Sequence, residues 1–288
     1  QTLRGALEHG VESIWKSSQD QLDTRREELV ELAGDLDVAP FAPMEAGELR
    51  SLVDEFVRDM PTDYLVSREP ADLLRQFIVY HRARSEGGTA IEFTPMRDRG
   101  VTEIVVATKD VPGTLAKIAG VLSASGLNIL TAEVTTTASG YSNDVFLVGQ
   151  SGSRFGRSEP QAPSDPNRLG RLEEKLVEVL SGDRAVADLL RKRIRETRLS
   201  PRPTPKVETS IRTHQDISDA FTVIEVRAPD RIGLLYEIAK TLWESGVSTH
   251  FSKIDSLGTK IIDTFYVEEL EGGKLSEEKL AELVGALE

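Results

Sequence analysis

The chain has 288 residues, of which 29% are charged and 39% are hydrophobic, and its net charge is −13. Such an acidic balance disfavours nucleic-acid binding, which usually needs a basic face, and the absence of cysteine excludes disulfides, thiolate nucleophiles and cysteine metal sites. No apolar run approaches the roughly 18 residues that span a bilayer, so we expect a cytoplasmic protein without a membrane partner. Because Gln1 lies within a helical pattern and no initiator Met or signal peptide precedes it, we expect a fragment of a longer protein.

Residues 1–88 carry helical patterns and are predicted to form a segment of helices. After a charged amphipathic stretch, one helix is predicted for about 45–59 and another for about 70–84. His81 lies on the apolar face of the latter, where a packed histidine is expected more often than a metal ligand.

The rest of the chain contains a duplication. Residues 102–128 and 222–248 align without a gap and share 11 identities in 27 positions. A period this long indicates two whole domains rather than a solenoid of short repeats.

Both copies show the same order of predicted elements. A strand rich in β-branched residues precedes a helix whose apolar residues recur at i, i+3, i+4 and i+7, and two strands and a second helix follow. Around that first helix, the elements are predicted at 103–108, 127–137, 141–148 and 167–180 in the first copy, and at 221–226, 247–256, 260–268 and 276–287 in the second. This β-α-β-β-α order predicts an α+β fold made of two ferredoxin-like modules.

A ferredoxin-like module needs a fourth strand beside its first. Strand-like runs at 89–93 and 206–212 precede the first strands, and short loops would return each run antiparallel onto its neighbour. We therefore expect a helical segment over 1–88, a first module over 89–205 and a second over 206–288, with the strand at 206–212 able to pair with either module.

The turn between the first strand and the first helix of each copy is the candidate binding site. Backbone N–H groups at a helix N-terminus are free donors in a positive local field, which suits a carboxylate. Gly113 and Gly233 allow close approach of a ligand or a neighbouring strand, and Pro112 is tolerated near the first helical position. Asp110 and Asp230 could cap the helix or could face the ammonium group of a ligand, and both alternatives stay open.

Residues 109–129 are KDVPGTLAKIAGVLSASGLNI, a stretch that resembles the signature of ACT domains, which are regulatory modules that bind amino acids in metabolic enzymes. Residues 229–248, PDRIGLLYEIAKTLWESGVS, resemble the same signature, with Ile232 where proline is common. The resemblance implies that ligands sit where the strand-to-helix loop of one module meets a neighbouring module. The implied effector-binding residues are Asp110, Val111, Pro112, Gly113, Thr114, Leu115 and Asn128 in the first copy, and Asp230, Arg231, Ile232, Gly233, Leu234 and Leu235 in the second. Ser248 stands at the counterpart of Asn128, so the two sites need not be equally competent.

Residues 60–81, MPTDYLVSREPADLLRQFIVYH, resemble a segment of the bifunctional uridylyltransferase/uridylyl-removing enzymes that act on the PII nitrogen-signalling protein. In that family a nucleotidyltransferase domain and an HD hydrolase domain precede two terminal ACT modules. The resemblance therefore implies that the helical segment is the tail of an HD-type domain and that the chain is a glutamine-sensing region controlling nitrogen metabolism.

The same resemblance implies a parent uridylyltransferase that needs Mg²⁺ and UTP and meets the PII protein through domains outside this chain. A homodimer through the ACT modules is one expected arrangement, and pairing of the modules within one chain is another. We expect no catalytic residue, metal ligand or cofactor here, because the Gly-Ser motif with paired aspartates and the His-Asp pair do not occur.

Two alternatives remain open. An enzyme with its own site would need organised carboxylate pairs, such as Asp263 with Glu268 or Asp165 with Glu173, and nothing in the sequence organises them. The ACT-type regulatory region of another metabolic or stringent-response enzyme would bind serine, valine or phenylalanine instead. The sequence upstream of Gln1 would distinguish that alternative from the glutamine-sensing region.

Overall fold

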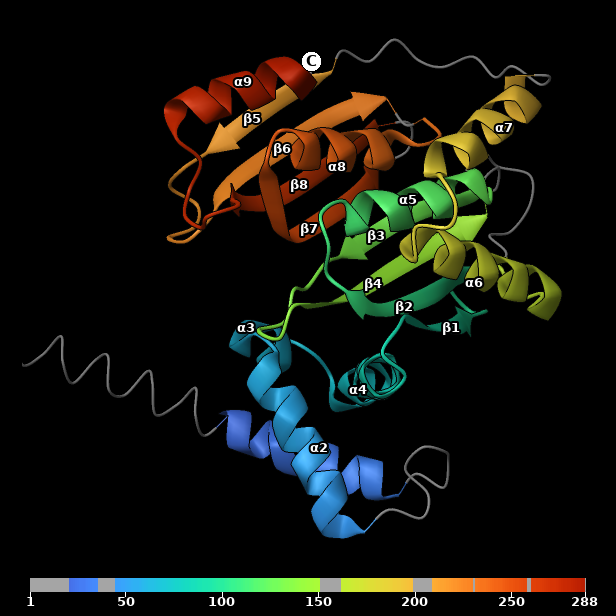
Figure 1. The fold of residues 1–288 in the computed structure, drawn as a ribbon, viewed down its shortest axis with the longest axis vertical. Coiled ribbons are helices and arrows are strands. Elements are labelled where there is room, and N and C mark those ends of the chain that lie inside the picture. Colours follow the sequence, from blue (N-terminus) through green and yellow to red (C-terminus); the bar gives the residue numbers. More distant parts are fainter. Residues whose placement is uncertain are drawn as a thin grey trace, which may run out of the picture.

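The computed structural model describes residues 21–35, 45–150, 162–198, 209–229, 231–257 and 260–287. Residues 21–34 are helical. The elements that follow are α2 (Ala46–Asp59), α3 (Thr62–Val66), α4 (Pro70–Ser85), β1 (Ala90–Met96), β2 (Val101–Lys109), α5 (Thr114–Ala124), β3 (Leu127–Glu133), β4 (Tyr141–Gln150), α6 (Pro166–Leu180), α7 (Val186–Arg198), β5 (Ser210–His214), β6 (Thr222–Pro229), α8 (Leu234–Glu244), β7 (Val247–Leu257), β8 (Lys260–Glu269) and α9 (Glu277–Leu287). Figure 1 shows the helical segment, the first module and the second module in succession along the long axis of the molecule.

Two four-stranded antiparallel sheets form the cores of the modules, with strand orders β1-β2-β4-β3 and β5-β6-β8-β7. The predicted α+β fold of two ferredoxin-like modules is therefore confirmed. The first strand of each module pairs with the short strand before it, Ala90 facing Ala107 and Ser210 facing Arg227. The strand predicted at 206–212 is Ser210–His214 and belongs to the second module; residues 206–208 lie outside the described part of the chain.

The two modules pack side by side within the chain. The edge strands β3 and β7 lie next to each other, and α5 packs against α8 on one side of the sheets (Figure 1). A single hydrophobic core runs through both modules. At Gly120 a Cβ atom would lie 2.2 Å from Val186 Cγ1 and 3.0 Å from Tyr236 Cδ2, so the missing side chain lets α5 approach both α7 and α8. The two modules thus pair within one chain through α5, α8, β3 and β7.

Helix α7 was not predicted from the sequence. Val186, Leu189 and Leu190 follow the i, i+3, i+4 spacing of one helical face, and all three are buried in the shared core. The polar surface of the helix and its lack of a counterpart in the second copy hid this signal. Leu190 of this helix lies beside the second strand-to-helix turn, 3.4 Å from the position that a Cβ atom on Gly233 would occupy.

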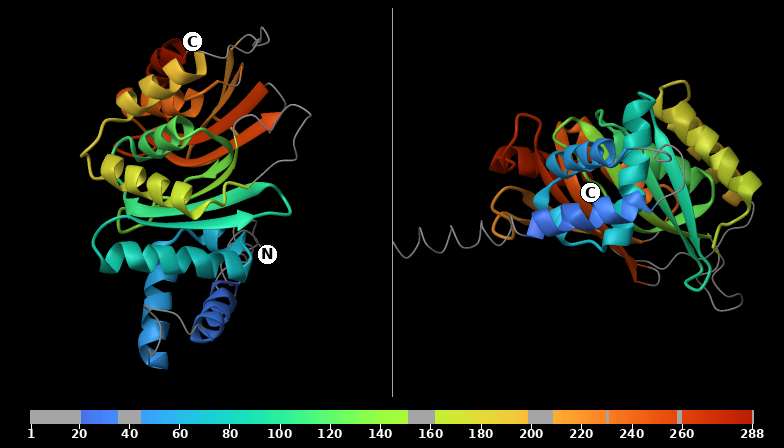
Figure 2. Two further views of the ribbon diagram at one scale, coloured as in Figure 1. Left: turned by 90° about the vertical axis from the view of Figure 1, so that its right-hand side faces the viewer. Right: turned by 90° about the horizontal axis from the view of Figure 1, so that it is seen from below.

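The described part of the helical segment packs against the first module (Figure 2). Val79 and Ala83 of α4 bury themselves against Val105 and Ala107 of β2, on the face of the sheet opposite α5. Behind α4, a separate core joins residues of α2, α3 and α4 to the helix at 21–34. The first sheet is therefore covered on both faces, by α5 on one and by α4 on the other.

Candidate functional site

The strand-to-helix turn of the first module is closed by a threonine. Thr114 Oγ1 accepts a hydrogen bond from the Val111 N–H at 3.1 Å and donates to the Val111 carbonyl at 2.7 Å. Gly113 occupies the N-cap position in a left-handed conformation with φ +85°, and no side chain caps the helix. The alternative that Asp110 caps α5 is thereby excluded.

Asp110 instead bonds to the connection between β3 and β4. Its backbone N–H donates to the Gly140 carbonyl at 2.9 Å, and its carboxylate accepts a hydrogen bond from Thr136 Oγ1 at 2.8 Å. Loss of solvent around the carboxyl raises its pKa above the ordinary value, against the opposing effect of the Thr136 hydrogen bond. The carboxylate is therefore held at the edge of the turn and remains available to a ligand.

A pocket of about 150 Å³ lies between the turn of the first module and the second module. A cavity of about this volume accommodates a molecule the size of benzene, so a small organic ligand fits. The first module contributes residues 110–116, Val134 and Ser142, and the second contributes Ala239, Trp243, Val247, Ser248, Thr249 and Leu270. The Thr114 N–H donates to the Val111 carbonyl at 3.0 Å. The amides that follow it at the start of α5 lack intrahelical acceptors, so this end of the helix offers the pocket hydrogen-bond donors and a positive local field.

Trp243 of α8 forms one wall of the pocket. A Cβ atom on Gly113 would lie only 2.7 Å from Trp243 Cε3, so the indole packs directly against the glycine backbone. Trp243 is 40% exposed, and Val111 and Leu270, which also line the pocket, are 41% and 65% exposed. The pocket thus combines an apolar rim with a carboxylate and helix-terminal amides.

The second turn has different surroundings from the first. Asp230 lies outside the described residues, and Arg231, just before α8, forms an ion pair with Glu237 in that helix. Gly233 has φ +80° and is buried, and a Cβ atom there would lie 3.4 Å from Leu190 Cδ2 of α7. Helix α7 thus occupies the place beside the second turn that Trp243 occupies beside the first.

The remaining residues implied by the resemblance lie in two kinds of surroundings, the shared core and the strands beside the pocket. Leu234 and Leu235 are buried in the shared core, against which Ile232 also packs. Asn128 is half-buried on β3 and is not among the residues lining the pocket, whereas its counterpart Ser248 is. The pocket therefore brings together the first turn and Ser248, and Asn128 is not part of its lining.

The residues that the second module adds to the pocket were missed from the sequence. Trp243 stands at the position of Ser123 in the other copy, so a large ring replaces a small side chain at one place in the duplication. Such a difference between two copies can indicate a functional residue. The sequence alone, however, does not show that α8 packs beside the first turn, and this packing is what puts Trp243 in the pocket.

The carboxylate pairs considered for an independent enzyme have structural partners. Asp165 caps α6 by accepting from the Asn167 N–H at 3.0 Å, and Glu268 lies 2.6 Å from His250 Nε2. Asp263 is fully buried on β8. In the ranges that the structure describes, no group of three or more His, Cys, Asp or Glu side chains is placed to hold a metal ion.

His81 is half-buried in α4 and lies beside Phe77, with ring centroids 6.3 Å apart. Burial lowers its pKa, which favours the neutral imidazole. These observations fit a packed histidine.

None of the described helices has the length and apolar character needed to cross a bilayer.

Known proteins share sequence similarity with this chain. The family model of the ACT domain matches residues 102–153. The bifunctional uridylyltransferase/uridylyl-removing enzyme of Rhodospirillum rubrum is 34% identical over 229 residues, and that of Caulobacter vibrioides is 33% identical over 239 residues. The matches cover 78% and 81% of this chain, respectively. This chain is homologous to part of these bifunctional enzymes.

The chain spans only 23% and 24% of the length of these two relatives. Among solved structures, an aspartate kinase from Synechocystis is 15% identical, with a TM-score of 0.35, covering 66% of this chain and 26% of that one. The ACT domain at residues 102–153 and the homology to the bifunctional enzymes together support a regulatory region.

Proposed function

We propose that this chain is the amino-acid-sensing regulatory region of a uridylyltransferase/uridylyl-removing enzyme and that glutamine is its effector. The observation that carries the proposal is the pocket between the two ACT modules, in which the Asp110 carboxylate and the N-terminus of α5 lie on the same turn. An amino acid carries an ammonium group and a carboxylate, and this turn offers a partner of opposite charge to each.

In this proposal the effector carboxylate binds the N-terminal amides of α5 and its ammonium group faces Asp110. The side-chain carboxamide then points toward Ser248 and Thr249 of the second module, which line the pocket. Because both modules contribute, binding stabilises their paired arrangement, and a ligand shifts a conformational equilibrium only through such differential affinity. The modules pair within one chain, so this site does not require a homodimer.

The activity of the parent follows as part of the same proposal. Glutamine would shift the attached domains between uridylylation and deuridylylation of the PII protein, a function in cytoplasmic nitrogen metabolism. In this proposal Mg²⁺, UTP and the PII protein bind to parts of the parent outside this chain, and no step is derived through them.

Glutamine is expected to raise the Tm of the chain, whereas glutamate leaves it nearly unchanged. A site that hydrogen-bonds the carboxamide leaves buried groups unpaired against the acid, at about 1–3 kcal/mol. A thermal-shift screen of the protein-forming amino acids, followed by calorimetry, provides the measurement. Equal shifts with both ligands would exclude glutamine selectivity, and a shift with serine, valine or phenylalanine alone would favour the regulatory region of a different enzyme.

Asp110→Asn is expected to weaken glutamine binding at least about tenfold, which corresponds to about 1.4 kcal/mol. Since Asp110 does not cap α5 and the amide can still accept from Thr136, the Tm of the unliganded variant should change little. The matched control is Asp98→Asn, which alters an exposed carboxylate in the β1–β2 turn away from the pocket. If calorimetry shows unchanged affinity in Asp110→Asn, the ammonium group of the ligand does not bind at Asp110.

A further inference from the structure

We propose that the β3–β4 turn, residues 137–140, transmits occupancy of the inter-module pocket to the helical segment. This inference rests on the proposed function and adds the route by which the site regulates the rest of the protein. Its physical basis is that the same short turn bonds to the ligand-binding turn on one side and to α2 and α4 on the other.

The first half of the route is the attachment of the turn to the pocket. The Gly140 carbonyl accepts from the Asp110 N–H at 2.9 Å, and Thr136, directly before the turn, donates to the Asp110 carboxylate at 2.8 Å. Both the backbone and the side chain of Asp110 are therefore fixed by this connection. A ligand that draws the Asp110 carboxylate toward its ammonium group pulls on residues 136–140 at the same time.

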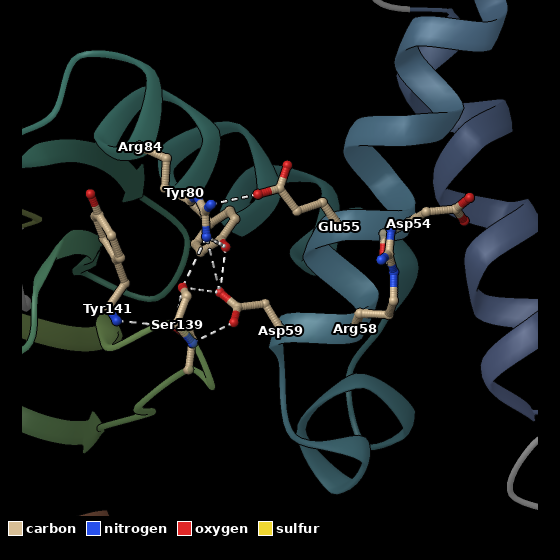
Figure 3. Close-up of polar contacts among 9 residues, drawn as sticks. Asp54, Glu55, Arg58, Asp59, Tyr80, Arg84, Ser139 and Tyr141 are labelled. Atoms are coloured by element: carbon tan, nitrogen blue, oxygen red, sulfur yellow. Dashed lines mark hydrogen bonds and ion pairs between the residues drawn. The ribbon is translucent and has the colours of Figure 1, made fainter.

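The second half is a polar cluster that holds the tip of the turn (Figure 3). Asp59, the last residue of α2, accepts from the Ser139 N–H at 2.6 Å, from Ser139 Oγ at 2.5 Å and from the Tyr80 hydroxyl. Its own carbonyl accepts from the Ala138 N–H at 2.9 Å. Arg84 of α4 donates to Ser139 Oγ at 2.9 Å and pairs with Glu55 of α2 at 2.5 Å.

The cluster is built around an ionised carboxylate. Asp59 is only 9% exposed, and this burial opposes ionisation. Hydrogen bonds from Ser139, Tyr80 and Thr137 together outweigh the burial and hold the pKa of Asp59 below its ordinary value. Hydrogen bonds to a charged group are stronger than neutral ones. The helical segment is therefore joined to the turn by strong hydrogen bonds, and in our proposal a displacement of the turn displaces Asp59 as well.

The attachment of the first module to the helical segment does not depend on this turn. The apolar contact between α4 and β2 persists without it, and Tyr64 also accepts from Asn143 Nδ2 at 3.0 Å. Loosening the turn should therefore change how the pocket and the helices influence each other rather than detach the module. Because coupling between sites is reciprocal, it can be measured from either end.

Asp59→Asn in the 288-residue chain is expected to lower glutamine affinity at least about fivefold, the lower end of usual coupling between sites. The affinity should fall because the pocket is formed while Asp59 holds Ser139. Without this contact the β3–β4 turn, and with it Asp110, is held less firmly in that arrangement. In the unaltered protein, glutamine should also slow hydrogen exchange of the amides at 138–139. The matched control is Asp54→Asn on the same helix, whose partner is Arg26 at 2.9 Å and which should leave both readouts unchanged.

A lower Tm with unchanged glutamine affinity and unchanged exchange would show that Asp59 is only a structural contact and would overturn the inference. If Asp59→Asn fails to fold, Ser139→Ala removes the hydroxyl contacts with Asp59 and Arg84 but keeps the backbone bond, and the same two readouts apply. If the unaltered chain does not bind glutamine, the proposed function fails and the inference falls with it. Binding without any response at 138–139 refutes the inference alone.

Discussion

Gly113→Val is expected to weaken effector binding at least about tenfold. At φ +85° a β-branched residue is strained, and its Cβ atom would lie 2.7 Å from Trp243 Cε3. If the indole, which is 40% exposed, moves outward, the pocket loses the wall that it provides. If the indole stays, the backbone of the turn has to shift instead. Either response alters the surface on which the ligand rests, and calorimetry with glutamine measures the loss.

Gly233→Val is the matched control. Its backbone is equally left-handed at φ +80°, so the strain of about 1–3 kcal/mol should be similar. Its Cβ atom, however, would meet Leu190 of α7 at 3.4 Å and does not border the pocket. Stability should fall in both variants, but affinity only in Gly113→Val. Loss of binding confined to Gly233→Val would move the site to the second turn.

Asp144→Asn is expected to stabilise the protein by about 2–4 kcal/mol more at pH 8 than at pH 5. Asp144 is fully buried on β4, and this burial raises its pKa to about 7 despite hydrogen bonds from Ser142 and the Thr135 N–H. A carboxyl with a raised pKa is protonated in the folded state and charged in the unfolded state between about pH 4 and 7. The folded protein then holds the extra proton, so the free energy of unfolding falls as pH rises through this window.

Asparagine imitates the protonated carboxyl and removes this decline, since each unit of pKa difference corresponds to about 1.4 kcal/mol. The measurement is chemical denaturation of both proteins at pH 5 and pH 8. Asp98→Asn, which alters an exposed carboxylate in the β1–β2 turn, serves as the control and should show the same pH dependence as the unaltered chain. An equal effect of Asp144→Asn at both pH values would mean that the carboxyl is already charged at pH 5.

The order of the elements could be predicted because periodicity and duplication are local signals. Identical pairs such as Ile118 with Ile238 and Leu122 with Leu242 lie on the buried faces of α5 and α8, so the repeat itself marks the core. Helix α7 was not predicted because its burial comes from packing against α5 and the second turn, which one stretch of sequence does not encode. Leu189 and Leu190 are apolar positions in a charged helix whose meaning depends on distant residues.

The candidate site was predictable to the same extent. The turn from Asp110 to Thr114 has a sequence signature, because glycine and a helix N-terminus leave local marks. Trp243 and Ser248 join it only because β3 and β7 lie next to each other, and that pairing is tertiary. The capping role left open for Asp110 depended on the position of the β3–β4 connection, which binds the carboxylate instead.

The cover that α7 places over the second turn sets the shape of the expected dose response. With Leu190 of α7 beside the second turn and the proposed site at the first, a chain titrated with its effector should saturate hyperbolically, with one molecule bound and a Hill coefficient near one. A sensor of this kind follows metabolite concentration gradually instead of switching at a threshold. Any steeper response of the assembled parent enzyme would then have to arise between chains.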